Sequence, residues 1–269
     1  MTTVEDHFGF TQLPFDKAIS DQNLWLPPSK KHLVDTICHA IDRRQNLVLT
    51  GEPGVGKTCV LRAVRHRLSD AEVRLTYCHN ATLSRRDFYR QLCIALDLSP
   101  SATAAALFHA VSTHVTELGR DRIHPVLILD EAQLLRPETL EHLHILLNYG
   151  WDAQPLLSLV LVGLPELEDR LRLRRNRALY TRLSHRLRID PLSVEDCADY
   201  IAVRLEDGGC KKEIFTHDAI SMICEASYGT LREIDRICQT ALLYATDQGR
   251  TLIERNQISE VLKKQENLP

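Results

Sequence analysis

The segment "NLVLTGEPGVGKT", residues 46–58, constrains the fold more than any other part of the sequence. Its first five residues form a short apolar run that is typical of a buried strand. The glycines, lysine and threonine that follow have the spacing G-x-x-x-x-G-K-[ST]. Glycines permit positive φ, and they let backbone N–H groups converge on phosphate oxygens at the start of a helix. The segment therefore predicts a strand, a phosphate-binding loop and a helix in direct succession.

This loop predicts how a nucleoside triphosphate and its metal ion are held. We expect Lys57 to reach the outer phosphates and the Thr58 hydroxyl to ligate Mg²⁺. A glycine-rich turn without a ligand is the alternative, and the complete motif between a strand and a helix disfavours it. The residues predicted to contact the nucleotide are Gly51, Glu52, Pro53, Gly54, Val55, Gly56, Lys57, Thr58 and Cys59.

A second motif, "VLILDEAQ", places Asp130 and Glu131 directly after another apolar run. At the carboxyl end of a strand, the aspartate can bind nucleotide and hold Mg²⁺ through water, and the glutamate can polarise an attacking water. Two such carboxylates could also be ordinary turn residues. Together with the loop they indicate an ATPase, because the Asp-x-x-Gly pattern of GTPases is absent here.

The remaining pattern predicts an α/β fold. Apolar strands are expected at 46–50, 73–77, 125–130, 156–163 and 186–190, alternating with helices at 29–43, from Lys57, at 84–96 and at 101–118. This alternation predicts a parallel sheet sandwiched by helices. After Pro191 only helices are expected, two of them starting with capping-box spacing at Ser193 and Thr230. We predict an irregular N-terminal extension (1–28), a P-loop ATPase α/β domain (29–191) and a small all-α domain (192–269).

Composition excludes several classes of protein. With 44 % hydrophobic and 26 % charged residues the chain is neither disordered nor a membrane protein, and no apolar run approaches the ~20 residues of a membrane helix. The N-terminus lacks a secretory signal, so a cytoplasmic protein is expected. Eight cysteines without a C-x-x-C pair favour reduced core thiols over disulfides or zinc. Net charge is only −3, but eight arginines lie between Arg170 and Arg188 and concentrate positive potential there.

Five segments resemble AAA+ ATPases of the ExeA/TniB type, a group that contains a secretion ATPase and the transposon target-selection ATPases TniB, TnsC and MuB. In chain order these segments are "GEPGVGKT", "LILDEAQLL", "LVLVGLPELEDRL", "RLSHRLRIDPLS" and "YGTLREIDRICQTALLYA". The opening "FGFTQLPF" is also similar to the start of that group, so the resemblance covers most of the chain. It implies that the small all-α domain is a lid over the nucleotide.

The resemblance implies further site residues. Arg186 matches the arginine finger that reaches the γ-phosphate of a neighbouring subunit, with Arg182 as a second candidate, and a guanidinium suits charge spread over several oxygens. Arg232 matches the sensor-2 arginine that closes over the nucleotide. Leu164 stands where the sensor-1 segment of the family has a polar residue. Either a neighbouring residue substitutes for it or hydrolysis is slow.

The arginine-rich segment and the N-terminal aromatic residues each have two interpretations. The arginines either form a solvated face and subunit interface, or some also contact DNA phosphates in a sequence-independent, salt-sensitive way. Aromatic residues between 8 and 25 either pack in a core or lie beside the adenine. The candidate DNA contacts are Arg172, Arg174, Arg175 and Arg177, with Arg85 and Arg86 as a second group.

The leading hypothesis is an ATP-dependent regulator of DNA transposition, with ATP and Mg²⁺ as cofactors. As the resemblance implies, it would self-assemble into a ring or filament on double-stranded DNA, with ATP between subunits, and recruit a transposase or target-selector protein. The main alternative is an ExeA-like ATPase of a secretion or cell-envelope system. The sequence ends at Pro269 with neither a membrane segment nor a wall-binding domain, which favours the first hypothesis. A signalling ATPase that only binds nucleotide is a third possibility.

Overall fold

The computed structural model of the chain describes residues 3–16, 19–79, 83–100, 103–210 and 212–266. Contacts divide the chain into two compact units. The sheet unit comprises residues 28–52 and 57–189. The helical unit comprises residues 1–27, 53–56 and 190–269. Each unit contains its own cluster of buried apolar side chains.

The sheet unit is built on five strands that pair only in parallel, in the order β2-β3-β4-β1-β5. Every residue of β3 and β4 is buried, which explains why their sequences are continuous apolar runs rather than alternating ones. The predicted parallel α/β fold is therefore confirmed. The strands are β1 (Asn46–Gly51), β2 (Val73–Cys78), β3 (His124–Leu129), β4 (Ser158–Gly163) and β5 (Leu183–Ile189).

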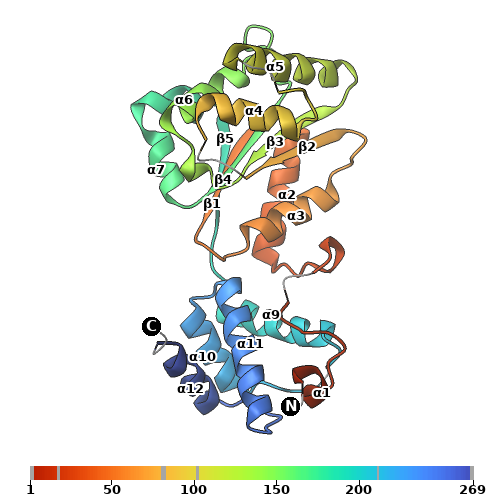
Figure 1. Cartoon of the computed structure of the whole chain (residues 1–269), viewed down its shortest axis with the longest axis vertical. Helices are drawn as coiled ribbons and strands as arrows, with labels where there is room; N and C mark the ends of the chain where they lie inside the picture. The colour runs from red at the N-terminus through yellow and green to blue at the C-terminus, as the bar shows by residue number, and fades with distance from the viewer. Residues whose placement is uncertain (1–2, 17–18, 80–82, 101–102, 211, 267–269) are drawn as a thin grey trace. The chain divides into compact units, whose positions relative to one another are not determined.

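Helices cover both faces of this sheet (Figure 1). Leu127, Leu129, Leu159 and Leu161 pack in one cluster with α4 (Arg85–Ala95), α5 (Ala104–Arg120) and α6 (Pro137–Leu146). The alternate strand positions face the other way, where α2 (Pro28–Asp42) and α3 (Lys57–Arg67) contact β1. The first two residues of the helix predicted at 101–118 lie outside the described residues.

The arginine-rich segment between β4 and β5 forms several short elements. These are α7 (Glu166–Arg172), the 3₁₀ turn η3 (Arg174–Asn176) and α8 (Arg177–Tyr180). A further 3₁₀ turn, η2 (Ala132–Leu134), follows β3. Because the segment turns repeatedly, its arginines point to different surroundings and do not form one continuous stripe.

The helical unit contains α9 (Val194–Asp207), α10 (His217–Ser227), α11 (Leu231–Asp247) and α12 (Arg255–Glu266). The N-terminal segment is less irregular than its sequence predicts, because it forms α1 (Val4–Phe8) and a 3₁₀ turn, η1 (Asp21–Asn23). Phe8, Phe10 and Phe15 are buried in the cluster formed by the C-terminal helices, and Trp25 packs against it. Core packing is therefore the use of these aromatic residues.

Several of the described helices begin with a side-chain cap. Ser84, Thr103, Ser193 and Thr216 each accept a hydrogen bond from a backbone N–H in the first turn of the helix that follows. The capping box predicted at Thr230 is wrong, since its hydroxyl donates instead to the carbonyl oxygen of Ser227. Across the described segments, no helix combines the length and the apolar character that crossing a membrane would require.

Replacing Phe15 tests whether the N-terminal segment is part of the helical unit. Phe15 is 1 % exposed, and its carbonyl oxygen accepts a hydrogen bond of 2.6 Å from the Gln239 side chain. Phe15→Ala should lower the free energy of unfolding of this unit by about 3–5 kcal/mol, because it leaves a cavity. The measurement is urea unfolding followed by the fluorescence of Trp25, in a background where the fully exposed Trp151 is replaced by Phe.

The matched control for this prediction is Leu13→Ala, since Leu13 is 45 % exposed. Its effect should stay below about 1 kcal/mol. Equal losses for the two variants would show that the segment does not share a core with the C-terminal helices.

Candidate nucleotide site

Parallel pairing brings the two sequence motifs to the same edge of the sheet. Gly51 ends β1, Gly163 ends β4, and Asp130 follows β3. Thr50 pairs with Gly163, and Leu129 pairs with Leu161, so the carboxyl ends of the three neighbouring strands are in register. Ligands of open α/β sheets bind outside these carboxyl ends. Gly51, where the phosphate-binding loop begins, therefore lies at the same edge of the sheet as Asp130 and Leu164.

The backbone of residues 51–58 adopts the conformation that the glycines predict. Gly54 and Gly56 have φ of 80° and 101°, which side chains disfavour. Lys57 is 8 % exposed, and its Nζ donates to the carbonyl oxygens of Gly51, at 2.7 Å, and Glu52, at 3.0 Å. The lysine thus lies within the loop as a buried positive charge. Val55 is buried, Cys59 is half-buried, and Glu52, Pro53 and Thr58 are exposed.

Residues 53–56 belong to the helical unit, and there they contact the start of α11. The backbone N–H of Arg232 donates to the carbonyl oxygen of Gly54 at 3.4 Å. A Cβ atom on Gly54 would lie 2.9 Å from the Cβ of Arg232, so only glycine fits at this approach. The structure therefore brings the backbone of Arg232 to the phosphate-binding loop.

Both carboxylate oxygens of Asp130 accept hydrogen bonds. Oδ1 accepts from the backbone N–H of Glu131 at 2.9 Å, and Oδ2 accepts from the Tyr77 hydroxyl at 2.5 Å. Burial and the hydrogen bond to Asp130 raise the pKa of Tyr77, which keeps its hydroxyl protonated as a donor. The sequence analysis missed Tyr77, since its proximity depends on β2 lying beside β3.

Glu131 lies at a strained turn that neighbouring side chains hold in place. Its φ of 52° is left-handed, which costs a non-glycine residue on the order of 1 kcal/mol. The Gln133 side-chain Nε2 donates to Glu131 Oε2 at 2.6 Å. The Arg170 guanidinium donates to the backbone carbonyl oxygens of Gln133 and Leu135. Sequence reasoning grouped Arg170 with the surface arginines, whereas the structure places it as a support of this turn.

The two candidate arginine fingers have different surroundings. Arg186 is exposed on the edge strand β5, with its guanidinium carbon 4.1 Å from the centre of the Tyr180 ring and a hydrogen bond of 3.1 Å to the Tyr180 carbonyl oxygen. Arg182 directly precedes β5 and donates to the Ala178 carbonyl oxygen at 3.0 Å and to Asp152 Oδ2 at 2.8 Å. Among the described residues, neither arginine forms a hydrogen bond or ion pair with the loop residues of the sheet unit, Gly51, Glu52, Lys57 and Thr58.

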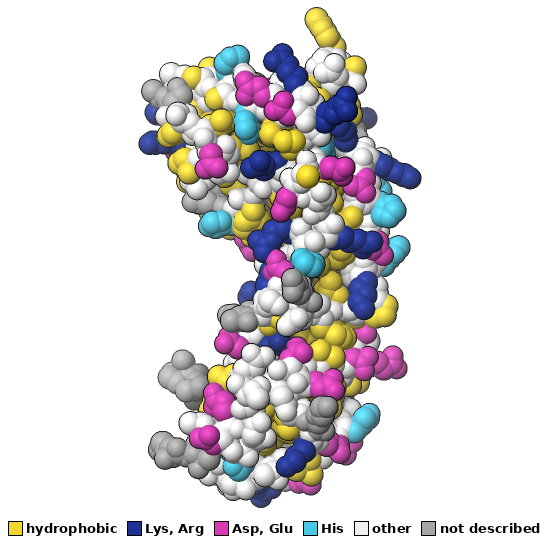
Figure 2. Space-filling view, turned by 90° about the vertical axis from the view of Figure 1, so that its right-hand side faces the viewer, with side chains coloured by type: hydrophobic (Ala, Val, Ile, Leu, Met, Phe, Trp, Pro, Cys, Tyr) yellow, Lys and Arg dark blue, Asp and Glu magenta, His cyan; other side chains and the backbone are white. Residues whose placement is uncertain are grey.

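The candidate DNA-contacting arginines are all exposed. Arg172 forms an ion pair with Glu168 at 3.3 Å, and Arg175 forms one with Glu141 at 3.6 Å. Within the described ranges no carboxylate pairs with Arg174 or Arg177. On the face shown in Figure 2, basic side chains are interspersed with acidic ones. Arg85 and Arg86 lie in the first turn of α4.

The oxygen ligands and the positive charge at this edge of the sheet suit Mg²⁺ and a triphosphate. Mg²⁺ prefers oxygen ligands, and the exposed Thr58 hydroxyl and the Asp130 carboxylate supply them. The buried ammonium of Lys57 and the N-terminus of α3 supply the positive potential that phosphate requires. The residues present fit both groups.

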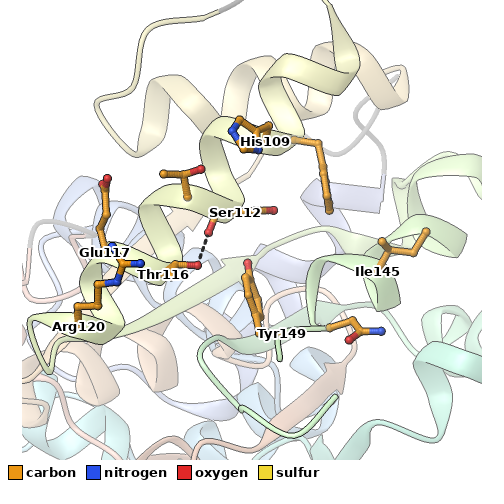
Figure 3. A pocket seen from close by; sticks show the side chains of 10 residues that line it. His109, Ser112, Thr116, Glu117, Arg120, Ile145 and Tyr149 are labelled. Atoms are coloured by element: carbon orange, nitrogen blue, oxygen red, sulfur yellow. Dashed lines mark hydrogen bonds between the residues drawn. The ribbon is translucent and has the colours of Figure 1, made fainter. Parts of the chain in front are cut away.

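A separate hollow of about 570 Å³ opens on the sheet unit between α5 and residues 145–149 (Figure 3). Ser112 and Thr116 lie on the α5 side, and Ile145 and Tyr149 lie opposite. The residues that line it include none of those predicted to bind nucleotide. This hollow is therefore distinct from the candidate nucleotide site.

This chain is similar to a curated protein and to several solved structures. General secretion pathway protein A of Aeromonas hydrophila is 34 % identical over 258 residues, which is 94 % of this chain and 46 % of that protein. This chain thus spans less than half the length of that relative. The ADPNP-ADP complexes of Aeropyrum pernix ORC2 superpose with a TM-score of 0.70 at 14 % identity, covering 97 % of this chain and 73 % of that one. The structure of Drosophila ORC bound to DNA superposes with a TM-score of 0.71 at 16 % identity. The match covers 95 % of this chain and 65 % of that one.

The likeness to the two ORC structures supports the fold. Residues 29–171, more than half of the chain, match the family described as AAA domain, and they contain both the phosphate-binding loop and the Asp130–Glu131 pair. This protein therefore belongs to the AAA domain family.

Proposed function

We propose that this protein is an ATP-hydrolysing switch in which ATP, bound at the interface of two copies of the chain, controls their association. In this proposal residues 29–191 are the ATPase domain, 192–269 are the lid, and 1–28 are an N-terminal extension. The observation that carries the proposal is the arrangement at one edge of the sheet. The phosphate-binding loop with its buried Lys57 follows β1, and the Asp130–Glu131 pair follows β3, which is separated from β1 by β4 alone.

The residues at this edge have distinct roles in hydrolysis. Lys57 and the loop amides would bind the outer phosphates, and Thr58 and Asp130 would hold Mg²⁺, which when bound supplies positive charge beside the phosphate oxygens. Glu131 accepts a proton from a water molecule as the water oxygen bonds to the γ-phosphorus. The bond from that phosphorus to the bridging oxygen breaks, leaving ADP and phosphate. The backbone N–H of Arg232 donates to the Gly54 carbonyl oxygen, and in this proposal its guanidinium would bind the phosphates.

The exposed edge strand β5 favours an arginine that acts between subunits. Arg186 lies on this strand and is exposed to solvent. A neighbouring copy could accept it at its own γ-phosphate, where the guanidinium would neutralise the charge that develops during transfer. Arg182 remains the second candidate for this role.

Two candidates exist for what the switch acts on. The 34 % identity to General secretion pathway protein A over nearly the whole chain favours a role in a secretion system. Exposed Arg174 and Arg177, which lack carboxylate partners in the described part of the chain, favour DNA phosphates as ligands. Binding of this protein to duplex DNA would support a more specific proposal, in which it regulates transposition and recruits a transposase or target-selector protein.

Lys57→Ala tests nucleotide binding. Affinity for a fluorescent ATP analogue should fall roughly 10- to 100-fold, because a charge-assisted hydrogen bond contributes about 1.5–3 kcal/mol. Lys31→Ala, an exposed lysine of α2, is the matched control and should bind as the unchanged protein does. Equal affinity of Lys57→Ala and the control would contradict the assignment of the loop.

Mixing two inactive variants tests the shared site. Glu131→Gln keeps Arg186 but should lose turnover about 10²- to 10⁴-fold, and Arg186→Ala keeps its own Glu131. An equimolar mixture should regain ATP hydrolysis, because the Arg186→Ala site receives an arginine from its Glu131→Gln neighbour. Turnover is measured by phosphate release at increasing protein concentration. Undiminished hydrolysis by Arg186→Ala alone would exclude it as the finger, and Arg182→Ala would then be tested in its place.

Salt-dependent binding separates the two candidate functions. With a non-hydrolysable ATP analogue, binding to random duplex DNA should weaken as salt rises, and Arg174→Ala/Arg177→Ala should reduce the slope of log K against log[salt] by about 2. Arg172→Ala/Arg175→Ala is the control and should reduce it less, because carboxylates already neutralise these arginines. Arg85→Ala/Arg86→Ala tests the second group in the same way. No affinity at low salt would exclude the DNA candidate and leave the secretion candidate.

A further inference from the structure

A base that takes a proton from water must be held in one orientation, yet Glu131 is an exposed side chain at a turn. An exposed glutamate has many rotamers, and holding it in one costs conformational entropy. The contacts of the surrounding side chains therefore decide how well Glu131 is positioned. In the described part of the chain, the Glu131 carboxylate accepts a side-chain hydrogen bond from Gln133.

Gln133 is anchored on two sides. Its Nε2 donates to Glu131 Oε2 at 2.6 Å, and its Oε1 accepts from the backbone N–H of Leu164 at 3.1 Å. Glu131 follows β3 and Leu164 follows β4, which are adjacent strands. The Gln133 amide therefore links the Glu131 carboxylate, which follows β3, to the Leu164 backbone, which follows β4.

Gly163 and Arg170 help to keep the Gln133 amide in this position. A Cβ atom on Gly163 would lie 2.5 Å from Gln133 Oε1, so a side chain at Gly163 would displace the amide. The Arg170 guanidinium holds the backbone of Gln133 through its carbonyl oxygen. The Leu164 side chain is apolar, so only the backbone at this strand end can offer a polar contact. Both the side chain and the backbone of Gln133 are thus fixed.

We propose that Gln133 is a positioning residue for ATP hydrolysis, which holds the Glu131 carboxylate through its amide and anchors it to the end of β4. This inference rests on the proposed function, because it assumes that Glu131 is the base. Gln133 occupies Oε2 of the carboxylate, so Oε1 faces the attacking water and receives its proton. The amide does not exchange a proton in the step. Movement of the β4 end relative to the β3 end would misalign the base, which couples turnover to the conformation of the sheet edge.

The test is a double-mutant cycle between positions 131 and 133, read as kcat and as nucleotide affinity. Gln133→Met keeps the size of the side chain but loses both hydrogen bonds, and it should lower kcat roughly 10- to 100-fold. Affinity for the ATP analogue should not change, because the hydrogen bonds of Gln133 in the described chain involve Glu131, Leu164 and Arg170, none of which is predicted to bind phosphate. In the Glu131→Gln background the same substitution should have no further effect, since the carboxylate that it positions is already gone.

Two further variants separate the contacts of the amide. Gln133→Glu keeps an acceptor for the Leu164 N–H but, when ionised, loses the donor to Glu131, and it should be as slow as Gln133→Met. Gly163→Ala leaves Gln133 unchanged but displaces its amide, and it should also lower kcat without changing affinity. Gln248→Met, an exposed glutamine after α11, is the matched control and should hydrolyse ATP normally.

The outcomes are distinguishable. Equal losses of kcat from Gln133→Met with and without Glu131→Gln would overturn the proposal, since a substitution that only disrupts folding would act in both backgrounds. Normal kcat for Gln133→Met would overturn it as well, while leaving the proposed function intact. Absence of hydrolysis by the unchanged protein, at any concentration with ATP and Mg²⁺, would instead overturn the proposed function and this role with it.

Discussion

Parallel pairing of five buried strands is the constraint on which the site depends. Parallel strands require crossover connections, and these place helices on both faces of the sheet and bury it. The strand order puts β4 between β1 and β3, so the ends of these three strands lie side by side. The phosphate-binding loop, Leu164 and the Asp130–Glu131 pair come together for this reason, although they are separated by many residues in sequence. The site is a consequence of the topology and of the residues that follow each strand.

The same edge of the sheet concentrates unfavourable backbone conformations. Gly54 and Gly56 have positive φ without penalty, because they lack a Cβ atom, but Glu131 has positive φ at a cost. Arg170 offsets this cost by donating to two carbonyl oxygens of the turn, and Gln133 connects the turn to β4. Strained residues held by their surroundings are typical of functional sites. The strain at Glu131 is therefore consistent with a functional role for its carboxylate.

The sequence predicted the parts of the structure that depend on local patterns. Apolar runs located the five strands, and the spacing of glycines located the loop, because a short motif contains all the information that such a turn needs. Tyr77, Gln133 and Arg170 were not identified, since their partners depend on which strands become neighbours. Helix α1 was missed because its five residues are too few for a periodic signal. Contacts between segments far apart in the chain could not be predicted from the sequence pattern.

Energetic differences between the two candidate fingers favour Arg186 as the residue that a second copy recruits. Its cation–π contact with the Tyr180 ring is exposed and contributes about 0.5–1 kcal/mol, and its hydrogen bond to the Tyr180 carbonyl oxygen is exposed as well. A γ-phosphate would replace both contacts, because it offers several anionic oxygens and a charge-assisted hydrogen bond to one of them contributes about 1.5–3 kcal/mol. Arg182 is more enclosed, with 25 % of its side chain exposed, and would lose both the Asp152 pair and the Ala178 hydrogen bond on moving. Tyr180 thus holds the Arg186 guanidinium weakly enough for the triphosphate of a neighbouring copy to compete for it. On assembly, the guanidinium would leave the Tyr180 ring and bind the phosphate.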